Sequence, residues 1–506
     1  MTVTDIAFDV DKYLELQSRE ILNRVEKFNN KLYLEFGGKI LFDYHAARVL
    51  PGFDPNIKIE LLQQLKEKTA IILCIYAGDI ERRKIRADFG ITYDVDALKL
   101  IDDLRKWGLN IAAVVITRFE DQPSVKMFKN KLERRGVQVH THRYTKGYPT
   151  DVNLIVSDQG YGANTYIETG KPLVVVTGPG PGSGKLATCL SQLYHEYKRG
   201  IHAGYAKFET FPIWNLPLKH PVNVAYEAAT ADLKDVNIID PFHLEAYGKT
   251  AVNYNRDVEA FPLLKRIFEK ITGEKSPYLS PTDMGVNKAG FCIVNDDIAR
   301  EASGQEVIRR FLRHSCEYMM GLVDKETVQR VDLLMDELDM EVEDRPVVTP
   351  ARNAAAQAGE RHQGNDGLCC GAAIQLKSGE IVTGKNSPLM HSASATILNA
   401  IKRLAEIPDK IHLIAPNIIQ AIAVMKNEIR DSREASLDLE EALIAVGAST
   451  PSNNAAQLAV DQLKNLRGCE MHITHMPTPG DEAGLRSLGI NLTSDPRFSS
   501  QSLFVK

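Results

Sequence analysis

The sequence predicts an α/β protein built from more than one domain. Its 506 residues are too many for a single hydrophobic core. Between residues 69 and 200, short apolar runs of strand length alternate with segments whose apolar residues recur at helical spacing. This alternation is typical of a mostly parallel sheet with helices on both faces.

The elements of this region follow one another in a clear order. Residues 70–77 (AIILCIYA) are apolar throughout, which suits a strand buried on both faces. A helix around residues 98–107 comes next, then a strand at 110–117 and a second helix around 125–132. Three further strands are expected, at 137–145 (VQVHTHRYT), 152–158 (VNLIVSD) and 172–178 (PLVVVTG).

The last of these strands leads into a glycine-rich loop, residues 178–185 (GPGPGSGK), and then into a helix from Leu186. A strand, glycines with accessible amides and a helix N-terminus are the parts of a phosphate-binding, P-loop-like turn. Lys185 is placed to reach terminal phosphate oxygens, so ATP with Mg²⁺ is the expected cofactor. The expected ligand-binding residues are Gly178, Gly180, Gly182, Ser183, Gly184, Lys185 and Thr188.

The match to the pattern G-x-x-x-x-G-K-[ST] is incomplete. Pro179 occupies the first glycine position, and Leu186 stands where the hydroxyl that binds magnesium is expected. Thr188 lies two residues further on, about 200° around the helix. The strand, the glycine-rich loop and the helix still favour phosphate binding. Because the hydroxyl expected on magnesium is displaced, hydrolysis or phosphoryl transfer stays open. The alternative is a tight strand-to-helix turn that binds no ligand.

Carboxylates at strand ends are the candidate magnesium ligands. Asp79 and Asp158 each follow an expected parallel strand, and α/β sheets bind ligands at the carboxyl ends of their strands. With Lys185 they form the candidate catalytic set. The alternative is that each carboxylate is solvated and caps the next turn.

Residues 201–255 show no clear periodicity and are rich in proline, aromatic, histidine and acidic residues. So long a segment without periodicity is expected to form functional surface. Its candidates for acid–base chemistry or substrate contacts are Glu209, His220, Asp232, Asp240, His243 and Glu245.

Four long segments resemble a family of uncharacterised bacterial proteins of similar length, over essentially the whole chain. They are KLYLEFGGKILFDYHAARVLPGFDP, VVVTGPGPGSGK, GYAKFETFPIWNLPLKHPVNVAYEAATADL and SPYLSPTDMGVN. The family is described as a domain of unknown function. The resemblance therefore implies a soluble bacterial cytosolic protein, without naming a reaction or a catalytic residue.

The C-terminal third looks like a cytidine-deaminase-type fold. Two short strands joined by Ser378-Gly379 precede a helix at 390–407, a strand at 411–416 (IHLIAP) and a helix at 417–429. In that fold H-x-E opens one helix and P-C-x-x-C opens the next. Here the matching positions read His391-Ser392-Ala393 and Pro416-Asn417-Ile418-Ile419-Gln420.

This resemblance implies a deaminase-like scaffold without a zinc site. Ala393 replaces the glutamate that moves protons, and Asn417 and Gln420 replace the two thiolates. A single histidine, His391, does not hold zinc. The alternative is a generic α/β domain with ordinary core helices.

Three domains are expected from these patterns: a nucleotide-binding-like α/β domain at 1–235, a mainly helical domain at 236–345 and the deaminase-like domain at 346–506. The net charge of −5 gives no broad basic face, so nucleic-acid binding is not expected. No apolar run reaches about 18 residues and no signal peptide is evident, which indicates a cytoplasmic protein without a membrane partner. The seven cysteines include no C-x-x-C pair, so no structural zinc site is expected and no residue is assigned as a resident metal ligand.

Three functions remain open at this point. The first is an enzyme that uses ATP for phosphoryl transfer or hydrolysis on an unknown small molecule. The second is a non-enzymatic sensor or assembly protein that binds a phosphorylated metabolite. The third, weaker, is a dinucleotide-dependent enzyme, because Gly182, Gly184 and Ala187 fit G-x-G-x-x-A. A homo-oligomer is compatible with this chain length, although no feature of the sequence fixes one.

Overall fold

The computed structural model describes residues 6–86, 90–209, 211–361, 364–365, 367–430 and 436–500. The chain forms two compact units, Met1–Gly304 (the N-terminal unit) and Gln305–Lys506 (the C-terminal unit). The three-domain division expected from the sequence stays a prediction.

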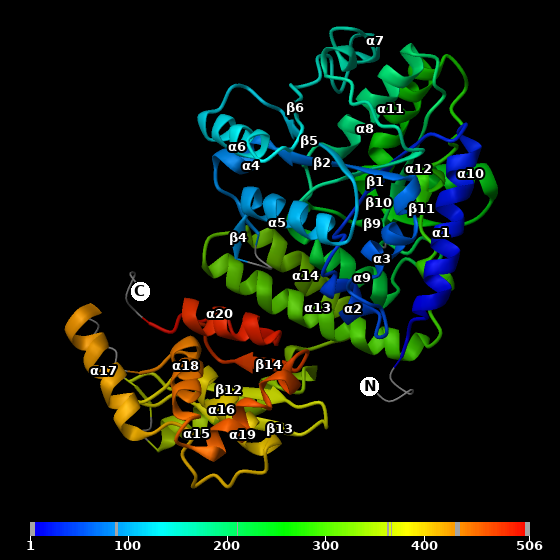
Figure 1. Cartoon of the computed structure of the whole chain (residues 1–506). Helices are drawn as coiled ribbons and strands as arrows, with labels where there is room; N and C mark the ends of the chain where they lie inside the picture. The colour runs from blue at the N-terminus through cyan, green and yellow to red at the C-terminus, as the bar shows by residue number, and fades with distance from the viewer. Residues whose placement is uncertain are drawn as a thin grey trace. The chain divides into compact units, whose positions relative to one another are not determined.

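A seven-stranded sheet with the order β11-β8-β1-β7-β2-β5-β6 forms the centre of the N-terminal unit (Figure 1). Every pairing within it is parallel, as the β-α-β order of the sequence predicts. Its strands are β1 (Leu32–Phe36), β2 (Thr69–Tyr76), β5 (Ile111–Thr117), β6 (Val139–Thr141), β7 (Leu173–Thr177), β8 (Gly204–Phe208) and β11 (Gly285–Val286).

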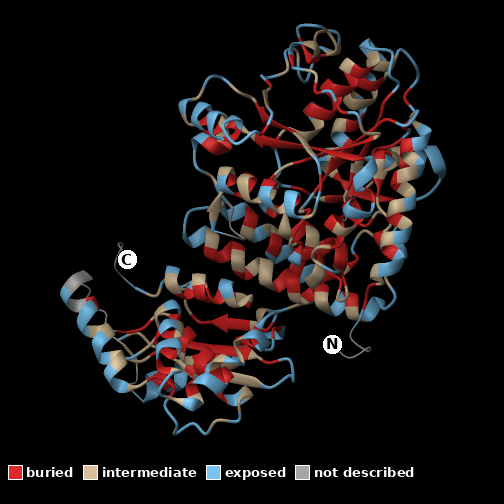
Figure 2. Ribbon diagram, in the orientation of Figure 1, coloured by how far each residue is buried: buried red, intermediate tan, exposed pale blue. Residues whose placement is uncertain are grey.

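Helices cover both faces of this sheet. Alternate residues of β2 point to opposite faces, so Ile72 and Cys74 join one core cluster while Leu73 and Ile75 join another. The first cluster packs against α8 (Lys185–Lys198) and α11 (Asn255–Thr272). The second packs against α4 (Ala77–Glu81), α5 (Tyr93–Lys106) and α6 (Pro123–Glu133). Figure 2 shows the strands as the most buried part of the unit.

The remaining elements of the N-terminal unit lie around this sheet. Two small antiparallel pairs are β3 (Ile85–Arg86) with β4 (Ile91–Thr92), and β9 (Asn237–Ile239) with β10 (Val252–Tyr254). The other helices are α1 (Val10–Lys27), α2 (Tyr44–Val49), α3 (Ile57–Gln64), α7 (Val152–Ile155), α9 (Pro221–Ala229), α10 (Pro241–Tyr247) and α12 (Pro281–Met284). Helix α13 (Asp296–Met319) continues past residue 304.

The expected strand at 152–158 is wrong, because residues 152–155 form the short helix α7. The Asp151 side chain accepts a hydrogen bond from the Leu154 amide at 3.0 Å and so caps the helix. A four-residue apolar run has no periodicity that separates strand from helix, and the local cap decides between them.

A four-stranded sheet with the order β13-β12-β14-β15 forms the core of the C-terminal unit. Strand β12 (Gly371–Gln375) is antiparallel to β13 (Ile381–Lys385) and to β14 (Glu470–Ile473), and β14 is parallel to β15 (Asn491–Ser494). The hairpin expected around Ser378-Gly379 is therefore confirmed. The unit's helices are α14 (Lys325–Glu337), α15 (Val348–Glu360), α16 (Ser392–Leu404), α17 (Pro416–Arg430), α18 (Leu439–Ser449), α19 (Asn454–Val460) and α20 (Pro479–Leu488).

The expected strand at 411–416 is wrong, because this segment is irregular. Leu413 and Ile414 are buried in the core as the apolar pattern requires. However, the Asn453 side-chain amide donates to the carbonyls of His412 and Leu413, at 2.9 and 3.3 Å. Those carbonyls are therefore held by a side chain, and Pro416 begins α17 directly afterwards.

No helix in the described ranges is both long enough and apolar enough to cross a membrane.

Candidate functional site

The carboxyl ends of β2 and β7 form a switch point in the parallel sheet. Strand β7 leads through α8 to β8, whereas its neighbour β2 leads through α4 and α5 to β5 on the other side. The helices of the two connections also cover opposite faces. Parallel α/β sheets bind ligands where adjacent connections diverge in this way. The loop of residues 178–184 lies at this point, between the strand and the helix that the sequence predicts.

The loop is held against the ends of β2 and β5. Gly184 has a φ of +88°, and a Cβ atom there would lie 2.7 Å from Thr117 Cγ2. The Thr117 hydroxyl donates to the Ser183 carbonyl at 2.8 Å. A Cβ at Gly178 would overlap the carbonyl oxygen of Cys74. Glycine is therefore required at both positions, because neighbouring strands approach the loop backbone closely.

Within the described part of the chain, no side chain caps the N-terminus of α8. Gly184 is the residue that precedes the helix, and the amides of residues 185–187 donate no hydrogen bond to any part of the chain that the structure describes. Unpaired amides at a helix N-terminus, together with the helix dipole, favour an anion. Pro179 and Pro181 add no amide donor to the loop.

Lys185 folds back over the loop that precedes it. Its Nζ atom lies 3.3 Å from the Gly180 carbonyl oxygen and 3.5 Å from Ser183 Oγ. Ser183 therefore supplies the hydroxyl beside Lys185, and it stands before the lysine in the chain instead of after it. Because the ammonium contacts a neutral carbonyl, it can exchange that contact for a phosphate oxygen without breaking an ion pair within the protein.

Arg118 is a second cation at the loop, and the sequence analysis missed it. It follows β5 directly, and its φ of +51° is left-handed, a strained conformation for a residue with a side chain. Its guanidinium carbon lies 3.5 Å from the centroid of the Tyr76 ring, and Nη2 donates to the Gly182 carbonyl. Its position directly after a predicted strand is the signal in the sequence that could have identified it, and Asp79 and Asp158 were candidates for the same reason.

A third cation and a second tyrosine lie beside the loop. A Cβ on Gly180 would overlap the Tyr93 ring, so this ring packs directly against the loop. Lys84 Nζ lies 5.2 Å from the centroid of the same ring. The loop is therefore bordered by aromatic rings that carry cations on their faces.

The two carboxylates proposed for magnesium lie in different places. Asp79 is in the first turn of α4, at the same sheet edge as the loop, and is buried and ion-paired with Arg82. Asp158 is exposed and accepts from the Tyr194 hydroxyl at 2.6 Å, with Lys198 Nζ 3.5 Å away. Tyr194 is nine residues after Lys185, about 13 Å along the axis of α8. The structure therefore separates Asp158 from the loop.

Thr188 faces the sheet. It is fully buried, and its hydroxyl accepts from the Cys74 thiol at 3.4 Å. Burial raises the pKa of Cys74 to about 12, so the thiol keeps the proton that it donates. This orientation does not agree with the prediction that Thr188 binds the ligand.

Glu209 belongs to a cluster of charged residues at the carboxyl ends of β1 and β8. Lys207 Nζ lies 2.9 Å from Glu209 Oε1 and also contacts Asp257. Burial raises the pKa of Glu209 to about 7 although Lys207 opposes this shift. In the same cluster the Tyr205 hydroxyl donates to Glu35 at 2.7 Å.

The other candidates in residues 201–255 have local structural roles or are exposed. His220 accepts from the Val222 amide at the start of α9 and pairs with Asp296 at 2.8 Å. Asp240 caps α10, and the His243 ring lies 3.1 Å from the Ser280 hydroxyl. Asp232 and Glu245 are exposed.

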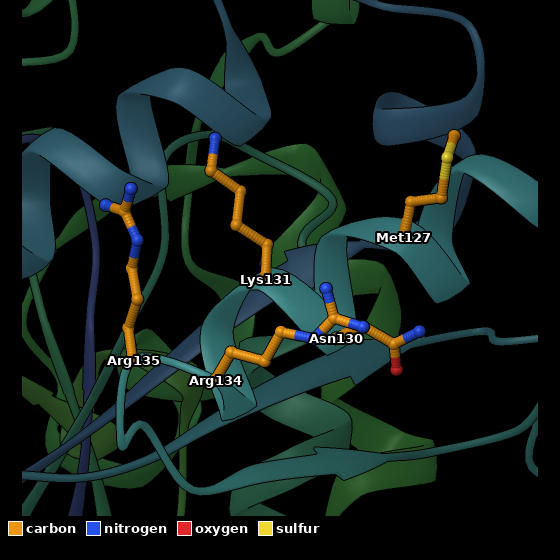
Figure 3. Close-up of a pocket in the computed structure, with 5 residues that line it drawn as sticks. All are labelled: Met127, Asn130, Lys131, Arg134 and Arg135. Carbon is orange, nitrogen blue, oxygen red and sulfur yellow. The ribbon is translucent and has the colours of Figure 1, made fainter.

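A small basic pocket lies on α6 and the turn that follows it. It has a volume of about 370 Å³ and is lined by Met127, Asn130, Lys131, Arg134 and Arg135. Figure 3 shows Lys131 and Arg135 extending to the same side. All five lining residues come from this one stretch of chain, so the pocket is a space between neighbouring side chains and we assign no ligand to it.

Two family models match the chain almost from end to end. The model described as "Domain of unknown function DUF1846, N-terminal" matches residues 6–339, and the one described as "Domain of unknown function DUF1846, C-terminal" matches residues 343–504. The chain belongs to the DUF1846 family. This confirms the whole-chain resemblance seen in the sequence.

Relatives of the DUF1846 chain are bacterial. It is 60% identical over 499 residues to a "UPF0371 protein" of Clostridium botulinum (strain Kyoto / Type A2), and 58% identical over 499 residues to one of Clostridium tetani (strain Massachusetts / E88). A further relative, from Clostridium botulinum (strain Alaska E43 / Type E3), is 57% identical over 499 residues. In all three cases the match covers 99% of both chains.

In the C-terminal DUF1846 region, His391 precedes α16 and its Nδ1 atom lies 2.7 Å from Asp481 Oδ2. Pro416 begins α17, so the two positions compared with the deaminase motifs do open helices. Within the described residues, no group of three or more histidine, cysteine or acidic side chains is placed to hold a metal ion. The deaminase-like assignment stays a prediction.

Proposed function

We propose that residues 178–185 and the first turn of α8 bind the phosphate groups of a nucleotide, with ATP and Mg²⁺ as the expected ligand. One observation carries this proposal: at the switch point of a parallel sheet, next to Lys185, lie three amides that have no acceptor among the described residues. The amides, the helix dipole and the lysine all favour a bound anion.

Phosphoryl transfer or hydrolysis on an unknown small molecule is the enzymatic form of this function. Lys185 would then stabilise the charge on the transferring phosphoryl group, and the loop amides would act in the same way. The segment of residues 205–247, Glu209 among them, is the expected substrate side.

A non-enzymatic sensor that binds a phosphorylated metabolite is the second candidate function. The placement of the proposed magnesium ligands favours it. Asp79 is already paired with Arg82, Asp158 lies along the second half of α8, and Leu186 follows Lys185. A site that binds without turnover does not need these groups at the loop.

Thermal unfolding tests the binding. Wild type, Lys185→Ala and the control Lys198→Ala, at the other end of the same helix, are melted with ATP, ADP, NAD or inorganic phosphate, with and without magnesium. A ligand at a hundred times its dissociation constant adds about 2.7 kcal/mol, or about 4 °C for a unit of this size. We expect this shift with ATP and magnesium in wild type and Lys198→Ala, and its loss in Lys185→Ala.

The outcomes separate the candidates. If no ligand moves the midpoint of wild type, the loop is a turn and the proposal fails. If ATP binds, release of ADP over time distinguishes the enzyme from the sensor. A shift with NAD that exceeds the shift with ATP would favour the dinucleotide-dependent enzyme instead.

A further inference from the structure

We infer that Arg118 is a second phosphate-binding cation of this site and that the ligand therefore carries a chain of at least two phosphate groups. The inference rests on the proposed phosphate site at residues 178–185 and names the chemical class of its ligand. The shared chemistry is a diphosphate group, whether it belongs to a nucleotide or to free pyrophosphate.

The position of Arg118 in the sheet supports a ligand longer than one phosphate. Lys185 and the free amides of α8 follow β7, whereas Arg118 follows β5, and β2 lies between these strands. The loop carries the start of α8 across the end of β2, because Gly184 lies against Thr117 at the end of β5. The two cations hold different points of this loop, since Lys185 Nζ lies 3.3 Å from the Gly180 carbonyl oxygen and Arg118 Nη2 contacts the Gly182 carbonyl. These carbonyls are two residues apart, up to about 7 Å in an extended chain, and an anion that binds both cations there extends along the loop, as a chain of phosphates does.

The guanidinium of Arg118 is already oriented toward the loop. The Tyr76 ring supports one of its faces, and Nη2 contacts the Gly182 carbonyl. Of its five N–H donors this contact uses one, and the planar group binds phosphate through two parallel hydrogen bonds. An arginine whose plane is fixed by stacking loses little side-chain freedom when a phosphate binds.

The backbone of Arg118 is strained, as is common for residues of a binding site. A left-handed φ is unfavourable for a residue with a side chain, and Arg118 adopts +51° where the chain leaves β5. Gly182, whose carbonyl it contacts, is also left-handed at +69°. Strained residues of this kind are concentrated at binding sites.

A titration of three ligands tests the inference. The dissociation constants of ATP, pyrophosphate and inorganic phosphate are measured by calorimetry for wild type, Lys185→Ala, Arg118→Ala and Arg199→Ala. The last variant is a matched control at the far end of α8. Arg199 also stacks on a tyrosine, with its guanidinium 3.9 Å from the Tyr166 ring centroid, and donates to a backbone carbonyl at 3.0 Å.

We expect Arg118→Ala to weaken the binding of ATP and pyrophosphate by about 10- to 150-fold, the range for a lost hydrogen bond to a charged group. Inorganic phosphate, held by the α8 amides and Lys185, should weaken by less than about 3-fold, and Arg199→Ala should match wild type. An equal loss for all three ligands would show that Arg118 only holds the loop, and would overturn the inference. So would unchanged affinities in Arg118→Ala while Lys185→Ala loses binding. If wild type binds none of the three, the proposed function fails and the inference fails with it.

Discussion

Replacing Gly184 by alanine tests how tightly the loop is held against the end of β5. Gly200, at the other end of α8, provides a matched control. Both glycines are left-handed, with φ of +88° and +78°. They differ in their surroundings, because a Cβ at Gly184 would lie 2.7 Å from Thr117 Cγ2, whereas one at Gly200 would meet no atom of the described residues within 4 Å.

The size of the effect follows from these two features. A left-handed alanine costs about 1–2 kcal/mol of folding free energy at either position. Carbon atoms in contact prefer about 3.5–4.0 Å, and forcing a methyl group into a filled space costs about 1–3 kcal/mol more. We therefore expect Gly200→Ala to lose about 1–2 kcal/mol and Gly184→Ala about 2–5 kcal/mol.

Urea unfolding followed by tryptophan fluorescence measures this difference in the right part of the chain. The protein has two tryptophans, Trp107 and Trp214, and both lie in the N-terminal unit. For a denaturant slope of about 3 kcal/mol per molar, a difference of 2 kcal/mol separates the two midpoints by about 0.7 M. Equal midpoints for the two variants would refute the close contact with Thr117.

Three further predictions concern other parts of the structure. Thr188→Val should leave the ATP-induced thermal shift unchanged, because the hydroxyl faces the sheet; a lost shift would place Thr188 in the site. Arg345→Met should destabilise the C-terminal unit by roughly 2–3 kcal/mol, since it removes a buried side chain that pairs with Glu470. Arg403 is exposed, so Arg403→Ala should lower the free energy of unfolding by under about 1 kcal/mol. Equal losses for the two arginine variants, measured by calorimetry, would contradict this contrast. Burial lowers the pKa of His142 to about 4, so the unfolded chain binds a proton between about pH 6.5 and 4 that the folded chain does not. The stability of wild type should therefore fall as the pH is lowered from about 6.5 to 4, and the urea midpoint of His142→Phe should fall less over the same range. Identical pH profiles for the two proteins would contradict this prediction.

The parallel sheet could be predicted where its strands are apolar throughout, as in β2, β5 and β7. Strands β1 and β8 escaped detection because each contains a charged residue that interrupts the pattern. These two residues, Glu35 and Lys207, stand opposite each other in the ladder. The two charges are brought together by the pairing of β1 with β8, which are about 170 residues apart in the chain. No local pattern in either strand reveals this strand pairing.

The candidate site was predictable to the extent that it is local in sequence. The glycine loop, Lys185 and the start of α8 follow one another along the chain, so their proximity could be inferred directly. Arg118 comes from a strand two places away in the sheet, and its approach depends on the strand order. Asp158 was placed at a strand end because residues 152–158 were predicted to form a strand, whereas the Asp151 cap makes residues 152–155 a helix.

The two prolines of the loop affect the rate at which a ligand associates and its residence time. Pro179 and Pro181 each fix φ near −65°, which limits the conformations of the free loop. Less conformational entropy is then lost on binding than in a loop of glycine alone. With little reordering before contact, association should proceed at similar rates for different phosphate compounds. Selectivity among them would then be expressed mainly in their residence times.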